Sequence, residues 1–286
     1  MAVVAVQQIR RMRGGAQGQL MLASDRRLYV VKFQNNPQHV RVLANEFLAT
    51  RLAEAVGLSV PRCEVVEVSA WLIANSPELT MLSARGGVPC AAGLQFGSEL
   101  VGGMIAGQLV DYLPAAQLHE VKNLGEFAGM LALDKWTGNA NGRQAVFLRK
   151  SRERKYRAVF IDQGYCFGAG EWGFRDAPLR GVYGRISVYG TVTGWHDFAP
   201  WLERLENFPA EKVWAAAEQL PPEWYGDAPA ELEQLVVGLL ARRSRVRELI
   251  DSFRMSDRRP FPAWGKPALA VVAQFQEWKG TGGTLQ

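Results

Sequence analysis

Cysteine and histidine are scarce in this sequence. Each occurs only three times among 286 residues, and no two cysteines show the C-x-x-C spacing of metal or redox sites. An odd number of cysteines also cannot pair completely within one chain. The sequence therefore gives little support to a disulfide framework or a zinc site, and its cysteine usage is that expected of a protein in a reducing cytoplasm.

Long hydrophobic runs are missing as well. The longest apolar stretches are interrupted by Arg, Asp, Gln or Gly well before the roughly 18 residues that a transmembrane helix needs. At the N-terminus an apolar patch precedes the first arginines, which is the reverse of the order in a secretory signal. We therefore expect neither membrane insertion nor export, and a cytoplasmic location.

The overall composition is that of a globular protein. Hydrophobic residues make up 48% and charged residues 21%, which excludes a disordered, collagen-like or coiled-coil chain. The net charge of +5 suits an anionic partner or ligand. Six of the nine residues 149–157 are basic, and a second cluster lies at 242–247. No basic stripe with regularly interleaved aromatic residues and no known reading module accompanies these clusters, so the sequence disfavours nucleic-acid binding, which would otherwise use residues 149–157.

The pattern of apolar residues predicts strands and one helix in the first part of the chain. Residues 27–33 alternate as a strand that places Val30 and Lys32 on one face. A helix is expected over 42–56, closed by a glycine. Residues 62–73 are expected to be extended, and 77–103 to form an irregular, glycine-rich connection.

The second part of the chain is predicted to be mostly helical. Apolar residues at 124, 127, 128 and 131 predict a helix that carries Asp134 at its C-terminal end. A β-hairpin is expected from strands 144–148 and 157–161. Further helices are expected over 198–206 and 209–220, and one long helix over 229–253.

Five features with chemical potential follow one another in order. They are a glycine-containing turn at 13–19, Lys32 in a strand, Glu46 on the next helix, Asp134-x-x-x-x-Asn139 after a later helix, and Asp162 at the end of a strand. The D-x-x-x-x-N spacing alone is expected by chance in about half of all chains of this length. The order and structural context of the five features carry the prediction.

The first features suit the binding of a nucleotide. Phosphoryl transfer needs cations around a polyphosphate, and a glycine turn lets backbone N–H groups approach phosphates because no Cβ obstructs them. We assign this role to the turn with Gly14, Gly15 and Gln17. Lys32 would contact the α- and β-phosphates, and Val30, on the same strand face, would cover the base.

The remaining features suit metal binding and proton transfer. Glu46 would hold the Lys32 ammonium by an ion pair. Asn139 and Asp162 offer the hard oxygen ligands that Mg²⁺ prefers. Asp134 would accept the proton of the substrate hydroxyl. Asn141 is either a second polar contact near the phosphates or an ordinary loop residue.

Four segments carry a resemblance to a known family. Residues 27–61, 93–98 (GLQFGS), 133–147 (LDKWTGNANGRQAVF) and 158–172 (AVFIDQGYCFGAGEW) resemble the stand-alone HipA-like kinase domain of bacteria. That family has the protein-kinase-like superfold and a loop similar to one in phosphatidylinositol kinases. The resemblance implies ATP and Mg²⁺ in a cleft between two lobes, with Lys32, Asp134, Asn139 and Asp162 at matching functional positions.

The sequence departs from the HipA toxins in three respects. The glycine turn lies close to the beginning of the chain, without the N-terminal subdomain through which HipA toxins contact their antitoxin, so an antitoxin partner is not part of the expectation. No serine lies in residues 13–19, where HipA toxins have a regulatory one. The loop also lacks a cation two residues after Asp134, and whether Lys135 substitutes for it is left open.

Together these observations predict a two-lobed α+β protein-kinase-like fold. A β-rich N-lobe with one main helix is expected over 1–109 and a mostly helical C-lobe over 110–286. The predicted function is ATP- and Mg²⁺-dependent transfer of the γ-phosphoryl group to a hydroxyl, by analogy that of a protein Ser or Thr. A small-molecule acceptor is one alternative. A nucleotide-binding scaffold, or pseudokinase, with little turnover is another.

Overall fold

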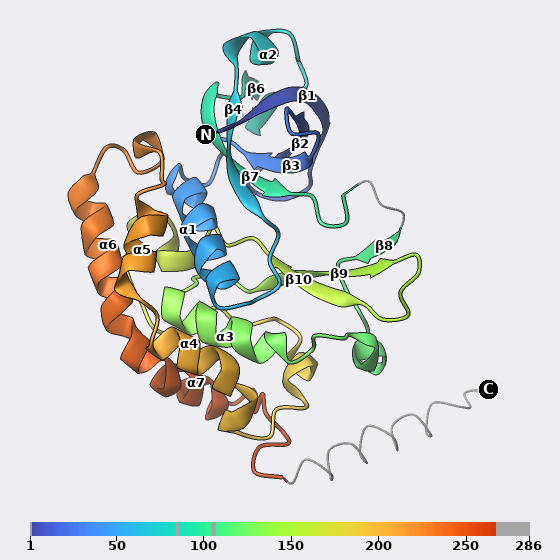
Figure 1. Cartoon of the computed structure of the whole chain (residues 1–286), viewed down its shortest axis with the longest axis vertical. Coiled ribbons are helices and arrows are strands. Elements are labelled where there is room, and N and C mark those ends of the chain that lie inside the picture. Colours follow the sequence, from blue (N-terminus) through green and yellow to red (C-terminus); the bar gives the residue numbers. More distant parts are fainter. Residues whose placement is uncertain (1, 84–85, 104–106, 267–286) are drawn as a thin grey trace.

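The N-terminal part of the chain forms a closed β-barrel, shown in blue and cyan at the top of Figure 1. The computed structural model describes residues 2–83, 86–103 and 107–266. The barrel order is β1-β2-β3-β7-β4, and only the pairing that closes it, between β1 and β4, is parallel. The strands are β1 (Val3–Arg11), β2 (Gln19–Ala23), β3 (Leu28–Lys32), β4 (Cys63–Val68) and β7 (Gly93–Glu99).

Strand β3 confirms the predicted alternation. Tyr29, Val31 and Phe33 belong to the buried core cluster of the barrel. Val30 and Lys32 lie on the opposite face and are partly exposed. Because successive side chains of a strand point to opposite faces, this register leaves the Lys32 side chain outside the barrel core.

Helix α1 (Arg41–Ala55) connects the barrel to the helical part of the molecule. It lies between the two in Figure 1, and most of its side chains are buried. Phe47 packs edge-on against Trp224, with ring centroids 6.1 Å apart. The helix ends before Gly57, whose φ of +82° suits a residue without Cβ. The predicted helix over 42–56 is therefore confirmed.

Two predictions for the rest of the N-terminal part were wrong. The extended segment 62–73 ends as strand β4 and is followed by the short helix α2 (Ala70–Ala74). Residues 77–103 are not irregular, because they contain the hairpin β5 (Thr80–Ser83) and β6 (Gly86–Pro89) and the barrel strand β7. In β7 a Cβ on Gly97 would overlap the Val66 side chain, so this glycine permits close strand packing.

A second sheet lies beside the helical part. Its order is β10-β9-β8, with β8 (Gly107–Val110), β9 (Gln144–Lys150) and β10 (Arg157–Ile161), and the predicted β9–β10 hairpin is confirmed. Helix α3 (Glu126–Thr137) packs on it through Phe127, whose ring centroid is 5.0 Å from that of Phe160. Because β8 pairs with β9, the chain joins this sheet just before residue 110. The lobe boundary between residues 109 and 110 stays a prediction.

Four further helices complete this part of the molecule as far as the structure describes it. They are α4 (Ala199–Glu206), α5 (Ala210–Ala217), α6 (Pro229–Ala241) and α7 (Val246–Arg254). Helices α4 and α7 pack on α3, and α5 packs against α1 and α6. The predicted long helix over 229–253 is interrupted by a 3-10 turn, Arg242–Arg245. At this turn the buried Arg242 donates to the main-chain oxygens of Lys135 and Trp136, at 2.8 and 2.9 Å, and so caps the C-terminal end of α3.

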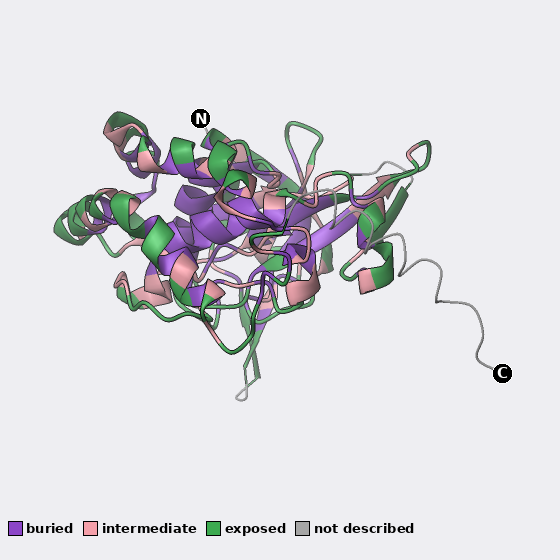
Figure 2. Cartoon of the chain, turned by 90° about the horizontal axis from the view of Figure 1, so that it is seen from below, coloured by how far each residue is buried: buried purple, intermediate pink, exposed green. Residues whose placement is uncertain are grey.

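The predicted α+β class is confirmed. Buried residues gather where the central helices meet the strands, whereas the outer helices and the loop tips are exposed (Figure 2). The three cysteines, Cys63, Cys90 and Cys166, are all free and buried. Among the helices of the described residues, none is both long and apolar enough to cross a membrane.

Candidate active site

The ammonium of Lys32 lies between two carboxylates. Its Nζ donates to Oδ1 of Asp162 at 2.8 Å and to Oε1 of Glu46. Burial alone lowers the pKa of Lys32, but the charges of Glu46 and Asp162 outweigh this effect and raise the pKa above its ordinary value. Lys32 therefore stays protonated, and 14% of its side chain is exposed, so the cation remains accessible from one side.

Glu46 is fixed by helix α1 on one side and by the chain after β10 on the other. Its Oε2 accepts from the N–H of Gln163 at 2.9 Å, while Oε1 accepts from Lys32. Asn45 anchors the same turn of α1 by donating to the carbonyl of Gly164 at 2.8 Å. Burial raises the pKa of Glu46, and the Lys32 ammonium opposes that rise. The structure thus brings together the two residues whose ion pair the sequence predicted.

Asp162 follows the last residue of β10 in a left-handed backbone conformation. Its φ is +64°, which is uncommon for a residue with a Cβ and better tolerated by Asp and Asn than by most others. Oδ1 accepts from Lys32, and Oδ2 accepts from Nε2 of Gln144 at 2.6 Å. Burial alone would raise the pKa of Asp162, but Lys32 and Arg143 lower it, so the carboxylate stays charged.

Asp134 lies in the last turn of α3, and its carboxylate is enclosed. The exposed fraction of its side chain is 0%. Arg143 binds both carboxylate oxygens, with Nε 2.9 Å from Oδ2, and Asn139 donates to Oδ1 at 2.9 Å. A Cβ on Gly181 would lie only 2.8 Å from the Asp134 Cβ, so the covering chain approaches very closely. In this conformation no oxygen of Asp134 is open to a substrate.

Asn139 and Asn141 form a small hydrogen-bonded unit after α3. The side chain of Asn139 is buried; its Oδ1 accepts from the N–H of Asn141 at 3.0 Å, and its amide group donates to Asp134. Asn141 is exposed, and its own Oδ1 accepts from the N–H of Gly142. Both polar atoms of the Asn139 side chain are therefore used within this unit, whereas Asn141 is an exposed residue.

Arg143 connects the Asp134 unit to the Asp162 backbone. Its Nη1 donates to the carbonyl oxygens of Ile161 and Asp162, at 3.0 and 3.2 Å, and to Oε1 of Gln163. Burial lowers the pKa of the guanidinium, but Asp134 outweighs this and raises it. Residues 32, 134 and 162 do converge, with Lys32 touching Asp162 directly and Asp134 reaching it through Arg143.

The predicted glycine turn joins β1 to β2 and runs beside Lys32. Gly14 has a φ of +127°, and a Cβ on Gly18 would lie 3.1 Å from Val30 and 3.9 Å from a Lys32 carbon. Gln17 is turned elsewhere, because its side-chain amide exchanges two hydrogen bonds of 2.7 Å with the backbone of Leu82 in β5. The turn thus approaches Val30 and Lys32, while Gln17 ties it to the β5–β6 hairpin.

Sequence reasoning missed Arg143 and Gln144. Gln144 begins β9 and is paired with Ile161 in the hairpin register, which places it next to Asp162. That position could have been inferred from the hairpin prediction. Arg143 offered no comparable signal, because its partners come from α3 and from the end of β10, and only the folded loop brings them together.

The described residues are suited to a metal only together with a nucleotide. Among residues 2–83, 86–103 and 107–266 there is no group of three or more His, Cys, Asp or Glu side chains placed to hold a metal ion. Mg²⁺ is usually bound by one or two carboxylates with phosphate oxygens and water. Asp162, with 28% of its side chain exposed, fits that requirement, whereas Asn139 is buried and its oxygen already accepts from the N–H of Asn141.

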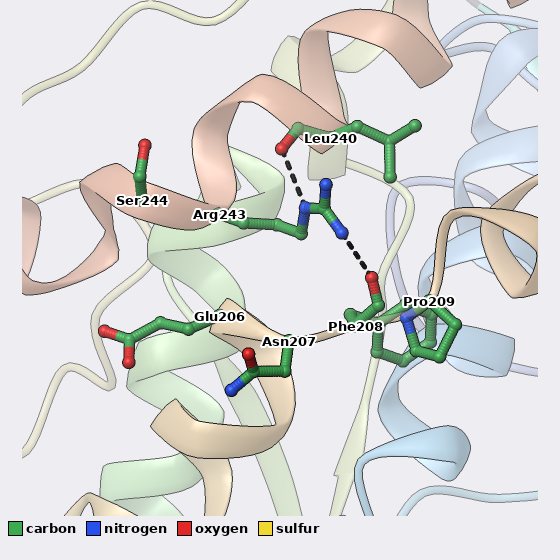
Figure 3. Close-up of a pocket in the computed structure, with 7 residues that line it drawn as sticks. All are labelled: Glu206, Asn207, Phe208, Pro209, Leu240, Arg243 and Ser244. Atoms are coloured by element: carbon green, nitrogen blue, oxygen red, sulfur yellow. Dashed lines mark hydrogen bonds between the residues drawn. The ribbon is translucent and has the colours of Figure 1, made fainter.

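A separate hollow lies between the α4–α5 connection and the end of α6, and neither Lys32 nor Asp162 lines it. It has a volume of about 690 Å³, and Figure 3 shows the residues that line it. Its cation, Arg243, donates to the carbonyl of Leu240 at 2.9 Å and to that of Phe208. Because this charge is already engaged with the backbone, the volume of the hollow does not by itself make it a candidate active site.

Lys135 allows a test of how the chain that covers Asp134 is held. Its Nζ donates to the carbonyls of Pro178 and Arg180, at 2.8 and 2.7 Å, and burial lowers its pKa to about 8. The unfolded chain keeps this proton up to the ordinary pKa of 10.5. Between pH 8 and 10.5 the unfolded state therefore binds more protons, and the free energy of unfolding rises with pH, by about 3 kcal/mol in all.

We expect this rise to disappear in Lys135→Met. Urea unfolding of both proteins at pH 7.5 and pH 9.5 gives the free energies of unfolding. The difference between the two pH dependences isolates Lys135, because all other titrating groups are common to both proteins. The free energy of unfolding of the wild type should increase relative to the variant by about 2 kcal/mol over this interval. Parallel pH dependences would show that Lys135 is not a buried cation.

One family model matches this chain. Residues 5–145 match the family model described as HipA-like kinase. The predicted resemblance to the HipA-like kinases is confirmed. The match spans the glycine turn, Lys32, Glu46, Asp134 and Asn139, and it supports a kinase function for this chain.

Solved structures show the same fold. This chain is similar to the Helicobacter pylori proinflammatory kinase CtkA, with 14% sequence identity, a TM-score of 0.53 and coverage of 86% of this chain and 99% of that one. It is also similar to hydra Fam20 bound to sugar, with 9% identity, a TM-score of 0.51 and coverage of 91% and 89%. No curated protein matches the sequence. The fold is therefore kinase-like.

Proposed function

We propose that this protein is an ATP- and Mg²⁺-dependent kinase that transfers the γ-phosphoryl group to a hydroxyl of a protein Ser or Thr. The observation that carries the proposal is the Lys32 ammonium, which is held between the Glu46 and Asp162 carboxylates. The three residues come from β3, from α1 and from the chain after β10. A protonated lysine beside a charged carboxylate offers one group for phosphate oxygens and one for a divalent cation. The HipA-like match supports the same class of reaction.

Each residue near Lys32 has a proposed task in binding the nucleotide. Lys32 binds the α- and β-phosphates, and Glu46 keeps its ammonium in place. The turn with Gly14 and Gly15 covers the phosphates with backbone N–H groups, and Val30 contacts the base. The approach of Gly18, at the end of the turn, to both Val30 and Lys32 supports these proposed tasks.

The metal and the acceptor belong on the side of Asp162. Mg²⁺, when bound with ATP, neutralises charge that develops on the phosphate oxygens. Asp162 would hold it, and Gln144 orients the carboxylate through the hydrogen bond of 2.6 Å to Oδ2. Asn141, which is an exposed residue, would contact the phosphates or the acceptor hydroxyl.

Asp134 and Asn139 are proposed to support the site from behind it. The transition state of phosphoryl transfer is loose, so positioning and electrostatics contribute more than a strong base does. Asp134 holds Arg143, which binds the backbone on both sides of the Ile161–Asp162 bond, and Asn139 fixes the backbone of Asn141. For Asp134 to act as the base, Arg143 would have to release its carboxylate.

The enclosure of Asp134 also favours a second candidate function. A chain without an accessible base could bind ATP and act as a scaffold with little turnover. Incubation with labelled ATP, Mg²⁺ and cell lysate, followed by mass spectrometry of labelled proteins, distinguishes the two. We expect transfer by the wild type and transfer at least roughly 100-fold slower by Asp162→Asn. Binding of ATP without transfer by either protein would favour the scaffold.

The proposed task of Glu46 makes a separate prediction. In Glu46→Gln the ammonium of Lys32 loses one charged partner and becomes free to shift toward Asp162. Because a hydrogen bond to a charged group contributes about 1.5–3 kcal/mol, the KM for ATP should rise at least tenfold, with a smaller change in kcat.

The control for this prediction lies on the same helix. Glu54→Gln removes a carboxylate that is 33% exposed and pairs with Arg51, far along α1 from Lys32. Its KM for ATP should stay within twofold of the wild-type value. Equal effects of the two substitutions would mean that Glu46 acts only on the stability of α1.

A further inference from the structure

The net charge of this protein is concentrated in one hairpin tip. Residues 149–157, called the basic tip below, comprise the turn between β9 and β10 and the strand ends beside it. They contain six basic residues and one acidic residue, so they carry a net charge of +5. Outside the basic tip 27 basic and 27 acidic residues remain, and the rest of the chain is neutral overall. A charge that is confined to nine residues is a local feature and not a general property of the surface.

The cations of the basic tip are exposed and weakly neutralised. Lys150, Arg152, Arg154, Lys155 and Arg157 are all exposed. The one carboxylate in the tip, that of residue 153, is bound from outside by the ammonium of residue 122 at 2.8 Å. Arg152, Arg154 and Lys155 form no salt bridge with any residue that the structure describes. Like charges held close together without counter-charges favour the binding of an anion.

The basic tip is rigidly connected to the candidate active site. The β9–β10 pairing runs without a break from Arg157 opposite Leu148 to Ile161 opposite Gln144. Gln144, at the other end of β9, donates to Asp162. The hairpin projects to the right in Figure 1, with the basic tip at its outer end. At roughly 3.4 Å per residue, the six steps from Gln144 to residue 150 place the tip about 20 Å from the site.

We infer that the basic tip is a docking surface for an acidic segment of the protein that accepts the phosphoryl group. The inference rests on the proposed kinase function. An extended polypeptide advances by about 3.3–3.6 Å per residue, so about six residues separate a hydroxyl at Asp162 from a side chain at the basic tip. The preferred acceptor therefore carries a cluster of Asp and Glu about five to seven residues from its Ser or Thr.

A nucleic acid fits the basic tip less well than an acidic polypeptide. Proteins that bind single strands usually stack bases on exposed aromatic side chains. Tyr156 is the one aromatic residue of the tip, and it is 4% exposed and covered by the Arg149 guanidinium, 4.7 Å from its ring centroid. The tip thus offers charge without a stacking surface, which suits carboxylates on an extended chain.

Direct binding tests the inference independently of catalysis. The probe is a fluorescent twelve-residue peptide with five consecutive Glu residues, measured by anisotropy at low and at moderate salt. The tip variant carries Lys150→Ser, Arg152→Ser, Arg154→Ser and Lys155→Ser. We expect its Kd to be at least tenfold higher than that of the wild type, and the wild-type affinity to fall with salt.

A matched variant controls for total charge. Arg10→Ser, Lys212→Ser, Arg258→Ser and Lys266→Ser remove four exposed cations that are scattered over the molecule. This variant should bind the peptide within twofold of the wild type. An equal loss of affinity in both variants would overturn the inference, because total charge would then explain the binding. Tighter binding of an RNA or DNA oligonucleotide of equal charge would overturn it in favour of a nucleic-acid site.

Phosphorylation of a peptide series provides the second measurement. Each peptide has one Ser and an acidic block placed three, six or twelve residues away. The wild type should show the lowest KM at six residues, and the tip variant should lose this preference without a change in the KM for ATP. Equal KM values for the wild type would overturn the inference but leave the kinase proposal standing. Absence of any transfer would overturn the kinase proposal, and peptide binding would still decide the role of the tip.

Discussion

The substitution Asp162→Asn is expected to lower the rate of phosphoryl transfer by roughly 10²- to 10³-fold, which is the usual effect of removing one group that stabilises transition-state charge. The carboxylate receives hydrogen bonds from Lys32 and Gln144 and is the accessible anion beside the proposed phosphate site. Asn keeps the shape of the side chain but removes its charge. Single-turnover measurements with labelled ATP and Mg²⁺ separate this effect from weaker nucleotide binding.

The fold should survive this substitution. Asn adopts a positive φ as readily as Asp does, so the backbone at +64° is not strained further. The matched control is Asp251→Asn, on α7, where a carboxylate that is 43% exposed pairs with Arg254. Its transfer rate should equal that of the wild type. A transfer rate of Asp162→Asn within tenfold of the wild type would place the metal elsewhere.

The part of the site near Lys32 could be predicted from local patterns. The alternation in 27–33 gives the face of Lys32, and helix 42–56 turns Glu46 toward it. Both patterns are governed by burial along a single element, since the barrel core takes Tyr29 and Val31, and the partner face of α1 takes Leu43 and Phe47. Local periodicity is therefore sufficient to place these two side chains.

The surroundings of Asp134 could not be predicted in the same way. The spacing to Asn139 predicted that the two would lie close together, and they do, with Asn139 donating to Asp134 at 2.9 Å. Whether the carboxylate is open or covered depends on Arg143 and on the chain near Gly181, which come from a loop and from a distant segment. No periodicity within α3 contains that information.

Strand β7 of the barrel also could not be predicted from local sequence. Residues 77–103 contain many glycines, and glycine usually indicates a loop. In β7, however, Gly97 lets the strand pack against Val66, and Gly93 begins the strand at a φ of +108°. The requirement for a small residue arises from the neighbouring strand β4, so it becomes visible only when the pairing is known.

The largest stability effects are expected at the buried ion pair of Asp134 and Arg143. The exposed fractions of the two side chains are 0% and 1%. Removing one partner of such a pair leaves the other charge buried and unpaired, which costs about 3–5 kcal/mol. Asp134→Leu and Arg143→Met should each lower the free energy of unfolding by this amount, a large part of the roughly 5–15 kcal/mol of a typical protein.

The double variant tests whether the pair acts as one unit. Asp134→Leu combined with Arg143→Met removes both charges, so its loss should be smaller than the sum of the single losses by about 2–3 kcal/mol. Part of the loss remains, because the carbonyls of Ile161 and Asp162 and the amide oxygen of Gln163 lose their donor. Urea unfolding of the four proteins measures the coupling, and additive losses would contradict it.

The same four proteins distinguish a positioning role of Asp134 from that of a base. If Asp134 is the base, removing Arg143 as well cannot restore the lost proton transfer. Asp134→Leu and the double variant would then be equally inactive. A positioning residue acts through Arg143, whose unpaired charge in Asp134→Leu would displace the backbone of Asp162. In that case the double variant should transfer phosphate at least tenfold faster than Asp134→Leu, because it no longer contains a buried, unpaired guanidinium. Transfer rates compared at a temperature where all four proteins are folded give the answer, and the enclosed carboxylate of Asp134 makes the second outcome the expected one.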